Sequence, residues 1–289
     1  MKEERPWQLA MFDKTLKKKM KIAGLKRHLG NLAGKRCFMV SCGDNNGALN
    51  YKLKELGGDW TWAEFEASSI PQIEELLGDP VTKVDAATGT MPFPDDEFDR
   101  VVVIDSHEHL EDPIPFTREL RRITKPDGKV VISVPNGDES MIVVRIKNLV
   151  GMTKEKYGHI VTGYDTPELS ELLARAELSP GPFSTYSRFF TEMLELGINF
   201  AYVMFASKKG DVEVEEGTIA PTTKEQMKSV EKTLKLYSLV YPLFRFVSWF
   251  DGLLFFTKGY AVVMEATPVL QPSEPSAAVT ASSAAAASS

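Results

Sequence analysis

Two short polar clusters, each directly after an apolar run, contain the residue types best suited to chemistry. The first covers residues 41–47, which follow the apolar run CFMV and precede a segment with apolar periodicity. This pattern indicates a strand, a tight turn and a helix. At the carboxyl edge of a parallel sheet such a turn presents backbone N–H groups and a helix N-terminus to a ligand. We therefore predict a cofactor site at this turn.

The second cluster covers residues 105–109, written DSHEH, and follows the strongest predicted strand, residues 98–104. Histidine is the side chain best suited to proton transfer near neutral pH. His107 is the first candidate for a base or an acceptor-orienting group. His159, in the later segment YGHIVTGY, is the second. The alternative for His109 is that it caps or packs the following helix.

An acidic residue, Glu64, ends the predicted second strand at residues 59–63. It lies about 20 residues after Gly43, a spacing that suits a carboxylate accepting hydrogen bonds from ribose hydroxyls. A helix-start carboxylate exposed to solvent is the alternative. The spacing therefore supports a nucleoside-containing cofactor only together with other signals.

The elements that must position these clusters alternate along the chain. Predicted strands at residues 37–40, 59–63, 81–84, 98–104 and 129–134 are separated by segments with helical character. The strand at 98–104 is β-branched and lacks polar alternation, which is typical of a strand buried on both faces. The alternation predicts an α/β fold with a doubly wound parallel sheet.

Four segments occurring in this order resemble the class I S-adenosylmethionine-dependent methyltransferases, in the branch called methyltransferase type 11. They are SCGDNNG, the acid Glu64, VDAATGTMPFPDDEFDRVVVIDSHEHLEDP and ELRRITKPDGKVVISVPN. The resemblance covers residues 34–178. It implies a Rossmann-like sheet of seven strands, mostly parallel with the last strand antiparallel, and S-adenosylmethionine as cofactor.

The resemblance also implies roles for individual residues. Glu64 would hold the ribose hydroxyls, Asp85 and Ala86 would face the adenine, and Asp105 would close the pocket beneath the sulfonium. The methionine part of the cofactor would be lined by Ser41, Gly43 and Asn45.

The turn departs from the family pattern at three positions. Met39 stands where the family often has an acid, Ser41 replaces the first glycine and Asn45 the third. Asparagine tolerates left-handed backbone geometry better than most residues, so the turn can keep its shape. Asp44 or Asp105 could replace the missing contact to the cofactor's amino group.

We expect five segments along the chain. Residues 1–34 form a basic helical segment, interpreted as a solvated helix packed on the domain, with a lid or a membrane contact as alternatives. The cofactor-binding core covers 35–187, a helical aromatic-rich insertion 188–258, the last core strand 259–267, and a disordered tail 268–289.

The insertion contains an aromatic stretch at residues 234–256, in which charged residues and Pro242 argue against a membrane-spanning helix. Three interpretations stay open. The stretch could complete the core as a buried helix, cover a hydrophobic acceptor or form a dimer face, or lie in a membrane surface.

A metal site is the less favoured interpretation of the second cluster. His107 and His109 with Asp105, Glu108 or Asp112 could supply nitrogen and oxygen ligands. The family pattern explains Glu108 and His109 without a metal, so no metal is expected.

Composition narrows the class of function. The net charge of −6 argues against general nucleic-acid binding. Two cysteines and no secretory signal predict a cytoplasmic protein, with membrane association as an alternative. The expected activity is methyl transfer to O, N or C of a small, hydrophobic or lipid-linked acceptor. The alternative is an inactive cofactor-binding scaffold or partner subunit, and a homodimer stays open.

Overall fold

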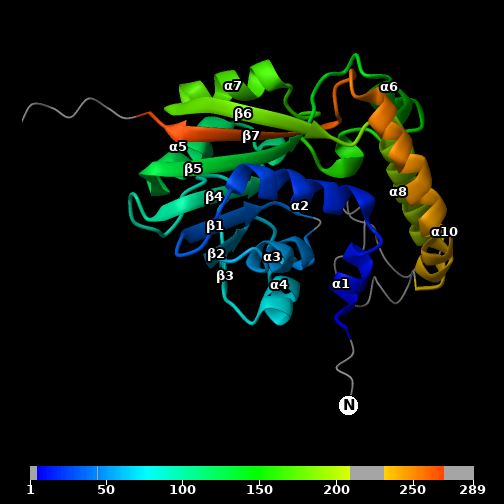
Figure 1. Ribbon diagram of the computed structural model, residues 1–289, viewed down its shortest axis with the longest axis horizontal. Helices are drawn as coiled ribbons and strands as arrows, with labels where there is room; N and C mark the ends of the chain where they lie inside the picture. The colour runs from blue at the N-terminus through cyan, green and yellow to red at the C-terminus, as the bar shows by residue number, and fades with distance from the viewer. Residues whose placement is uncertain (1–4, 44, 209–230, 270–289) are drawn as a thin grey trace, which may run out of the picture.

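A seven-stranded sheet forms the centre of the computed structural model, which describes residues 5–43, 45–208 and 231–269 (Figure 1). The strand order is β3-β2-β1-β4-β5-β7-β6. β1 to β5 run parallel, and β7 pairs antiparallel with both β5 and β6. The strands are β1 Arg36–Ser41, β2 Asp59–Glu64, β3 Val81–Lys83, β4 Phe98–Ile104, β5 Thr124–Pro135, β6 Leu178–Tyr186 and β7 Ala261–Pro268. The predicted fold class is confirmed.

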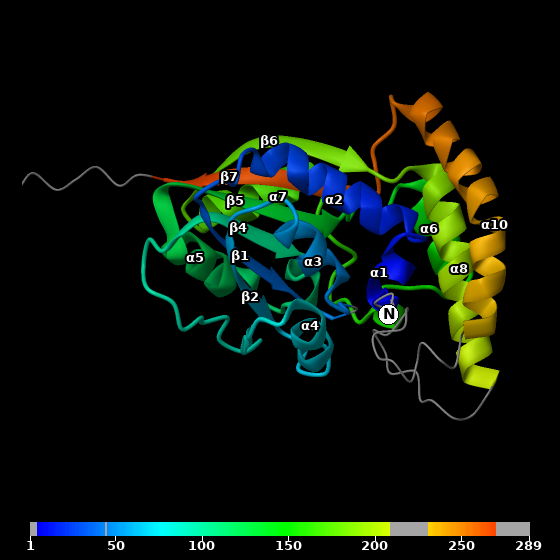
Figure 2. The same ribbon diagram turned by 60° about the horizontal axis from the view of Figure 1, so that its bottom comes forward.

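Helices cover both faces of this sheet (Figure 2). Apolar residues of α1, α2, α3 and α4 form one core with the sheet, and those of α5 and α7 form another on the opposite face. The helices are α1 Trp7–Phe12, α2 Leu16–Leu29, α3 Ala48–Lys54, α4 Ile70–Leu77, α5 Pro113–Ile123, α6 Ile142–Leu149, α7 Thr166–Arg175, α8 Phe189–Lys208 and α10 Glu231–Trp249. Short 3-10 turns are η1 His107–His109, η2 Glu155–Tyr157 and η3 Phe250–Leu254.

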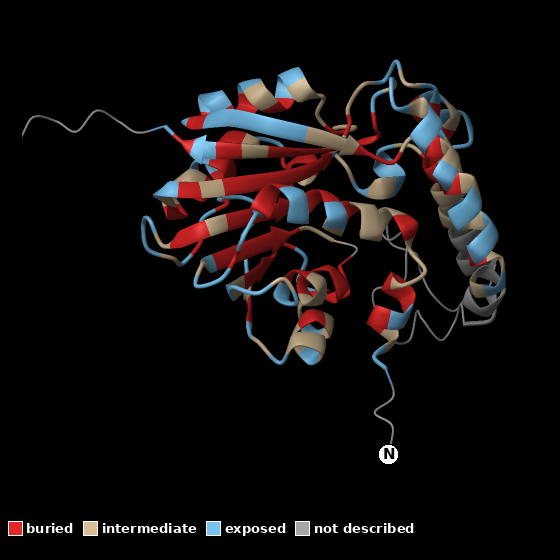
Figure 3. Cartoon of the chain, in the orientation of Figure 1, coloured by how far each residue is buried: buried red, intermediate tan, exposed pale blue. Residues whose placement is uncertain are grey.

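The central strands β1 and β4 show why the sheet is buried on both sides. Successive side chains of a strand point to opposite faces. Val101 and Val103 of β4 enter the core under α5 and α7, whereas Val102 and Ile104 enter the core under α2 and α3. Both sets are buried, and Figure 3 shows the central strands in the colour of buried residues. Because both sets are apolar, the strand is stable only between two helical layers.

The basic N-terminal segment lies against the sheet as α2. Its inward face includes Leu25 and Leu29, both fully buried, and Gly24, where a Cβ would lie 3.3 Å from the side chain of Val263 on β7. Close packing of this helix on the sheet follows from these small and apolar residues. The segment is therefore built into the core rather than attached at its edge.

The helices α8 and α10 lie side by side at one end of the molecule, beyond the end of the sheet (Figures 1 and 2). A buried carboxylate, Asp251 of η3, joins the two by accepting hydrogen bonds from the backbone N–H groups of Arg188 and Phe190. Among the described residues, no helix has the length and apolarity needed to cross a membrane. Residues 209–230 of the predicted insertion and the tail beyond 269 lie outside the described residues.

Candidate functional site

The predicted cofactor turn closes around the carboxylate of Glu64. Oε2 accepts a hydrogen bond of 2.7 Å from the Ser41 hydroxyl. Oε1 accepts bonds from the backbone N–H groups of Gly43 at 3.2 Å and Glu66 at 3.0 Å. Because β1 and β2 are paired in register at Ser41 and Glu64, the two strand ends bring these groups together. The structure thus unites three of the predicted cofactor residues.

Burial governs the charge of this carboxyl group. Glu64 is fully buried, and burial raises its pKa to about 7, although the hydrogen bonds from Glu66, Ser41 and Gly43 act in the opposite direction. The group therefore changes its protonation near neutral pH. Added donors such as ribose hydroxyls would favour the ionised form.

Asn45 holds the shape of the turn. Its side-chain nitrogen donates to the Ser41 hydroxyl at 2.7 Å and to the Asn50 side chain at 3.0 Å, and its oxygen accepts from the Gly47 N–H at 3.0 Å. An asparagine in place of a glycine is therefore compensated by side-chain hydrogen bonds. Asp44 lies outside the described residues.

Open space lies in front of Gly43. Its φ of +64° is in the left-handed region, and a Cβ added there would meet no atom within 4 Å. The backbone of the turn can therefore be approached by a ligand at this residue. This opening, next to the Glu64 carboxyl, fits a cofactor that presents hydroxyl groups.

Asp85 and Ala86 follow β3, beside the end of β2, and are exposed. The Val84 N–H donates to the carbonyl of Glu64 at 3.0 Å, which fixes this loop next to the turn. Asp85 Oδ1 accepts from the Ala87 N–H at 3.0 Å. Both residues thus lie on the same edge of the sheet as Glu64, where an adenine could reach them.

Asp105 follows β4 at the same edge and adopts a positive φ of 46°. Its carboxylate forms an ion pair with Lys21 of α2, whose side chain is 9% exposed. Burial lowers the pKa of Lys21, but the Asp105 carboxylate raises it further, so the net shift is upward. Sequence reasoning missed Lys21, because nothing in the run of lysines around it distinguishes the one that the fold buries.

His107 lies in the interior. The ring is fully buried against Phe116 and Tyr164, and its Nε2 lies 3.1 Å from the Thr117 hydroxyl. That hydroxyl donates to the Pro113 carbonyl, so it accepts from His107 Nε2–H. Burial lowers the pKa of His107 to about 4, which keeps the imidazole neutral. Its catalytic role stays a prediction.

His159 lies instead beside His109 and Glu108. The two imidazole centroids are 4.8 Å apart, and one ligand atom from each of the three residues lies within 4.8 Å of the others. Burial lowers the pKa of both histidines, that of His159 to about 3. Burial also raises the pKa of Glu108 well above its ordinary value.

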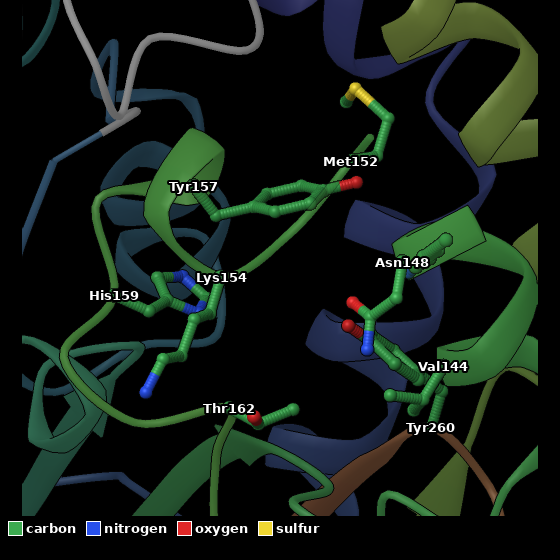
Figure 4. Close-up of a pocket in the computed structure, with 9 residues that line it drawn as sticks. Val144, Asn148, Met152, Lys154, Tyr157, His159, Thr162 and Tyr260 are labelled. Carbon is green, nitrogen blue, oxygen red and sulfur yellow. The ribbon is translucent and has the colours of Figure 1, made fainter. Parts of the chain in front are cut away.

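A small cavity of about 20 Å³ adjoins His159. Figure 4 shows His159 and Tyr157 on one side of it and Asn148 and Tyr260 on the other. Its walls come from α6, the segment after it and Tyr260, the residue before β7. A cavity of this size has room for about one water molecule.

A buried charge network borders the cavity. Glu192 of α8 is fully buried and accepts from Lys147 at 2.7 Å and from Lys17 of α2 at 3.0 Å. Although burial opposes ionisation, the two lysines hold the pKa of Glu192 down at about 2. Lys147 also lies 3.5 Å from the centroid of the Tyr260 ring. The network joins the N-terminal helix to α6 and α8.

Part of the chain resembles known proteins in sequence. Residues 38–132 match a family described as "Methyltransferase domain". The chain is 26% identical over 153 residues to the ubiquinone biosynthesis O-methyltransferase of Cereibacter sphaeroides, covering 51% of this chain and 61% of that protein. It is 26% identical over 111 residues to a rice (Oryza sativa subsp. japonica) tocopherol O-methyltransferase, covering 38% of this chain and 26% of that protein. The chain thus spans less than two thirds of these relatives.

Solved structures share the fold. A chain from the complex of the Haloferax volcanii Trm112 methyltransferase activator with a methyltransferase superposes with a TM-score of 0.54 at 15% identity, covering 93% of this chain and 96% of that one. The [4+2]-cyclase SpnF superposes with a TM-score of 0.55 at 14% identity, covering 88% of this chain and 82% of that one. Geranyl diphosphate C-methyltransferase from Streptomyces coelicolor superposes with a TM-score of 0.50 at 14% identity, covering 87% of this chain and 77% of that one. These similarities concern the fold alone.

The family match falls on the strands and turns that carry Ser41, Gly43, Glu64 and Asp105. The sheet order with its antiparallel strand β7 is the one expected of the same family. The match over residues 38–132 and the sheet order therefore support assignment of this chain to the class I S-adenosylmethionine-dependent methyltransferases.

Proposed function

We propose that this protein transfers a methyl group from S-adenosylmethionine to a small apolar or lipid-linked acceptor, with a hydroxyl oxygen as the preferred atom and nitrogen or carbon as the others. The observation that carries the proposal is the buried Glu64 carboxyl, held by Ser41 and Gly43 beside open space at the turn. A carboxylate at the end of this strand could also accept hydrogen bonds from ribose hydroxyls.

Different residues at this edge would contact different parts of the cofactor. Glu64 would accept from the ribose hydroxyls, Asp85 and Ala86 would flank the adenine, and Asp105 would lie toward the sulfonium. S-adenosylmethionine supplies the reactive methyl group, and methyl transfer is an in-line displacement. The protein then has to orient the acceptor and exclude water, which can supply much of the rate.

A general base matters only for a hydroxyl or a protonated amine. His107, His159 and Asp105 are the candidates. His159 adjoins the cavity, whereas His107 is enclosed by the core. We place His159 before His107 for this role.

An apolar acceptor is supported by two kinds of observation. The relatives are named as methyltransferases for tocopherol and ubiquinone, and a protein of the same fold acts on geranyl diphosphate. Independently, α10, η3 and the two residues after η3 expose large apolar side chains. These are Leu239, Leu243, Phe246, Trp249, Leu253, Phe255 and Phe256, here called the apolar stripe.

We propose that the apolar stripe contacts a membrane surface that holds the acceptor. Leu239, Leu243 and Phe246 repeat at helical spacing, and Arg245 is exposed among them. Aromatic residues beside basic ones are typical of helices that lie in the membrane interface. A homodimer through the same stripe is the competing interpretation.

An inactive scaffold is the second candidate function. The pairing of Asp105 with Lys21 fills part of the edge where the sulfonium would lie, and Met39 is fully buried where the family often has an acid. The likeness to a [4+2]-cyclase also shows that this fold serves other reactions.

The test is turnover with S-adenosylmethionine labelled in its methyl group. We expect labelled product from a long-chain hydroquinone in detergent, and less from its short-chain analogue. Saturable binding of S-adenosylhomocysteine without product from any lipid extract would favour the scaffold. Absence of cofactor binding would contradict both candidates.

A further inference from the structure

The geometry points to a divalent-cation site formed by Glu108, His109 and His159, suited to a zinc-like transition metal rather than to Mg²⁺. The three side chains come from the loop after β4 and from the segment after η2. One ligand atom from each lies within 4.8 Å of the others. This inference does not depend on the proposed methyl transfer, since metal binding is measurable in the protein alone.

Glu108 provides the independent observation that points to a ligand. Its side chain is fully buried, and neither carboxylate oxygen has a hydrogen-bond partner. Buried carboxylates are normally hydrogen-bonded or paired, because leaving their oxygens unsatisfied is costly. A cation between this carboxylate and the two imidazoles would satisfy it.

The two histidines are held in place by the backbone. His109 Nδ1 lies 2.9 Å from the carbonyl of Gly158 and donates to it, which leaves Nε2 as the free ligand atom. The Ile160 N–H donates to the backbone carbonyl of Glu108 at 2.8 Å. Gly158 and Ile160 flank His159, so the same two hydrogen bonds that join the segments also bring His159 to the pair.

This arrangement has the features of metal centres. Ligating histidines usually donate their second ring nitrogen to a carbonyl or carboxylate, as His109 does to Gly158. Two imidazoles with one carboxylate are typical of catalytic zinc and of non-haem iron, which keep further positions open. Ligands of a tetrahedral zinc lie roughly 3.3 Å apart, as metal–ligand lengths of about 2 Å imply. A closure of about 1.5 Å would complete the site.

The donor set also decides between metals. Imidazole nitrogen suits zinc, iron, nickel and copper, whereas Mg²⁺ prefers oxygen ligands and keeps its waters. No metal was expected from the sequence because the family pattern explains Glu108 and His109 without one, and the ligand set considered there contained His107, which the fold buries beside Thr117, and not His159. A metal on His159 would prevent that residue from acting as a base, so metal binding and the proposed role as a base exclude each other.

The experiment is titration of the full-length, tag-free protein with Co²⁺ after removal of metal by chelation. We expect one ion per chain, with visible absorption bands of nitrogen-ligated Co²⁺ that Zn²⁺ abolishes and Mg²⁺ leaves unchanged. Glu108→Gln and His159→Asn should each weaken binding by about 100-fold or more, since even outer-shell changes cost 10–100-fold. Folding of each variant is checked by circular dichroism.

Glu111→Gln is the matched control, because it makes the same chemical change at an exposed position of the same loop. It should bind Co²⁺ like the wild type. The inference is overturned if the wild type binds no Co²⁺ at micromolar concentration, if Mg²⁺ displaces it, or if a folded Glu108→Gln variant binds as the wild type does. Zn²⁺ should also raise the melting temperature of the wild type but not of His159→Asn.

Discussion

Glu64 combines the two properties that the cofactor site requires, acceptor oxygens and a position at the edge of the sheet. Burial raises its pKa to about 7, so near neutral pH the carboxyl is divided between its two forms. Ribose hydroxyls donate hydrogen bonds and therefore favour the carboxylate. Cofactor binding and ionisation of this residue should be coupled.

The affinity for S-adenosylhomocysteine should rise with pH. If the ionised form of Glu64 binds the ligand, the affinity increases by about tenfold between about pH 6 and pH 8. Calorimetry across this range measures it, and Glu64→Gln should remove the dependence. A pH-independent affinity in the wild type would show that Glu64 does not titrate at the site.

The raised pKa of Glu64 also predicts how the stability of the ligand-free protein changes with pH. A raised folded-state pKa means that the contribution of Glu64 is fully present below about pH 4.5 and is lost as pH rises through about 7. Compared with Glu64→Gln, the wild type should therefore lose stability between about pH 5 and pH 8. Chemical denaturation at several pH values measures this difference.

His107 should contribute to stability more than to catalysis. Its buried ring donates to Thr117, so His107→Asn should lower the free energy of unfolding by about 1–3 kcal/mol and leave kcat nearly unchanged. Denaturation and steady-state rates on the same preparations separate the two effects. A large loss of kcat at unchanged stability would instead support the catalytic role predicted from sequence.

At the scale of elements, helix α2 connects the N-terminus to the functional edge of the sheet. Lys21 reaches Asp105, and Lys17 reaches Glu192 on α8. Charged side chains buried in pairs are costly to separate. The helix is therefore fixed over the site by two ion pairs as well as by its apolar face.

Glu192→Gln should destabilise the protein by about 3–5 kcal/mol, because it leaves the buried Lys147 without the carboxylate that it pairs with and removes the ion pair of the partly exposed Lys17. Because the pKa of Glu192 is depressed, its contribution to the free energy of unfolding is present above about pH 4.5 and is lost as pH falls through about 2. Thermal and urea denaturation measure the loss. Exposed Glu171→Gln is the control and should change stability little. A small loss in Glu192→Gln would show that the network is not stabilising.

The order of elements was predictable because each strand and helix carries a local signal. The run FDRVVVI identified β4, and its burial on both faces followed from the lack of polar alternation. Lys21 and Asp105 lie 84 residues apart, and Lys17 and Glu192 lie 175 apart. No local pattern records such contacts, so the burial of these lysines became visible only in the fold.

At the scale of the molecule, the outer helices α8 and α10 lie beyond the end of the sheet (Figure 1), and α10 carries most of the apolar stripe. The interpretation of residues 234–256 as a buried helix is wrong for Trp249, Phe255 and Phe256, which are 68%, 77% and 74% exposed. Tyr241, on the same helix, is buried. Aromatic composition alone could not distinguish the buried face of this helix from its exposed face, because which residues are buried depends on where α8 packs against it.

The apolar stripe should bind lipid. The protein should sediment with vesicles of phosphatidylcholine and phosphatidylglycerol, and the triple variant Trp249→Ser, Phe255→Ser, Phe256→Ser should lose most of this binding. Phe183→Ser on β6, where the ring is 54% exposed, is the control. A wild type that ignores vesicles but forms dimers that the triple variant cannot form would contradict membrane contact and support a dimer face.

Binding of the demethylated cofactor tests the central claim most directly. Titration calorimetry of S-adenosylhomocysteine into the wild type at about pH 8 should give one saturable site. Glu64→Gln should weaken binding at that site, and the exposed Glu75→Gln should leave the affinity unchanged. No saturable heat in the wild type, or equal affinity in a folded Glu64→Gln variant, would contradict the assignment of this edge as the S-adenosylmethionine site.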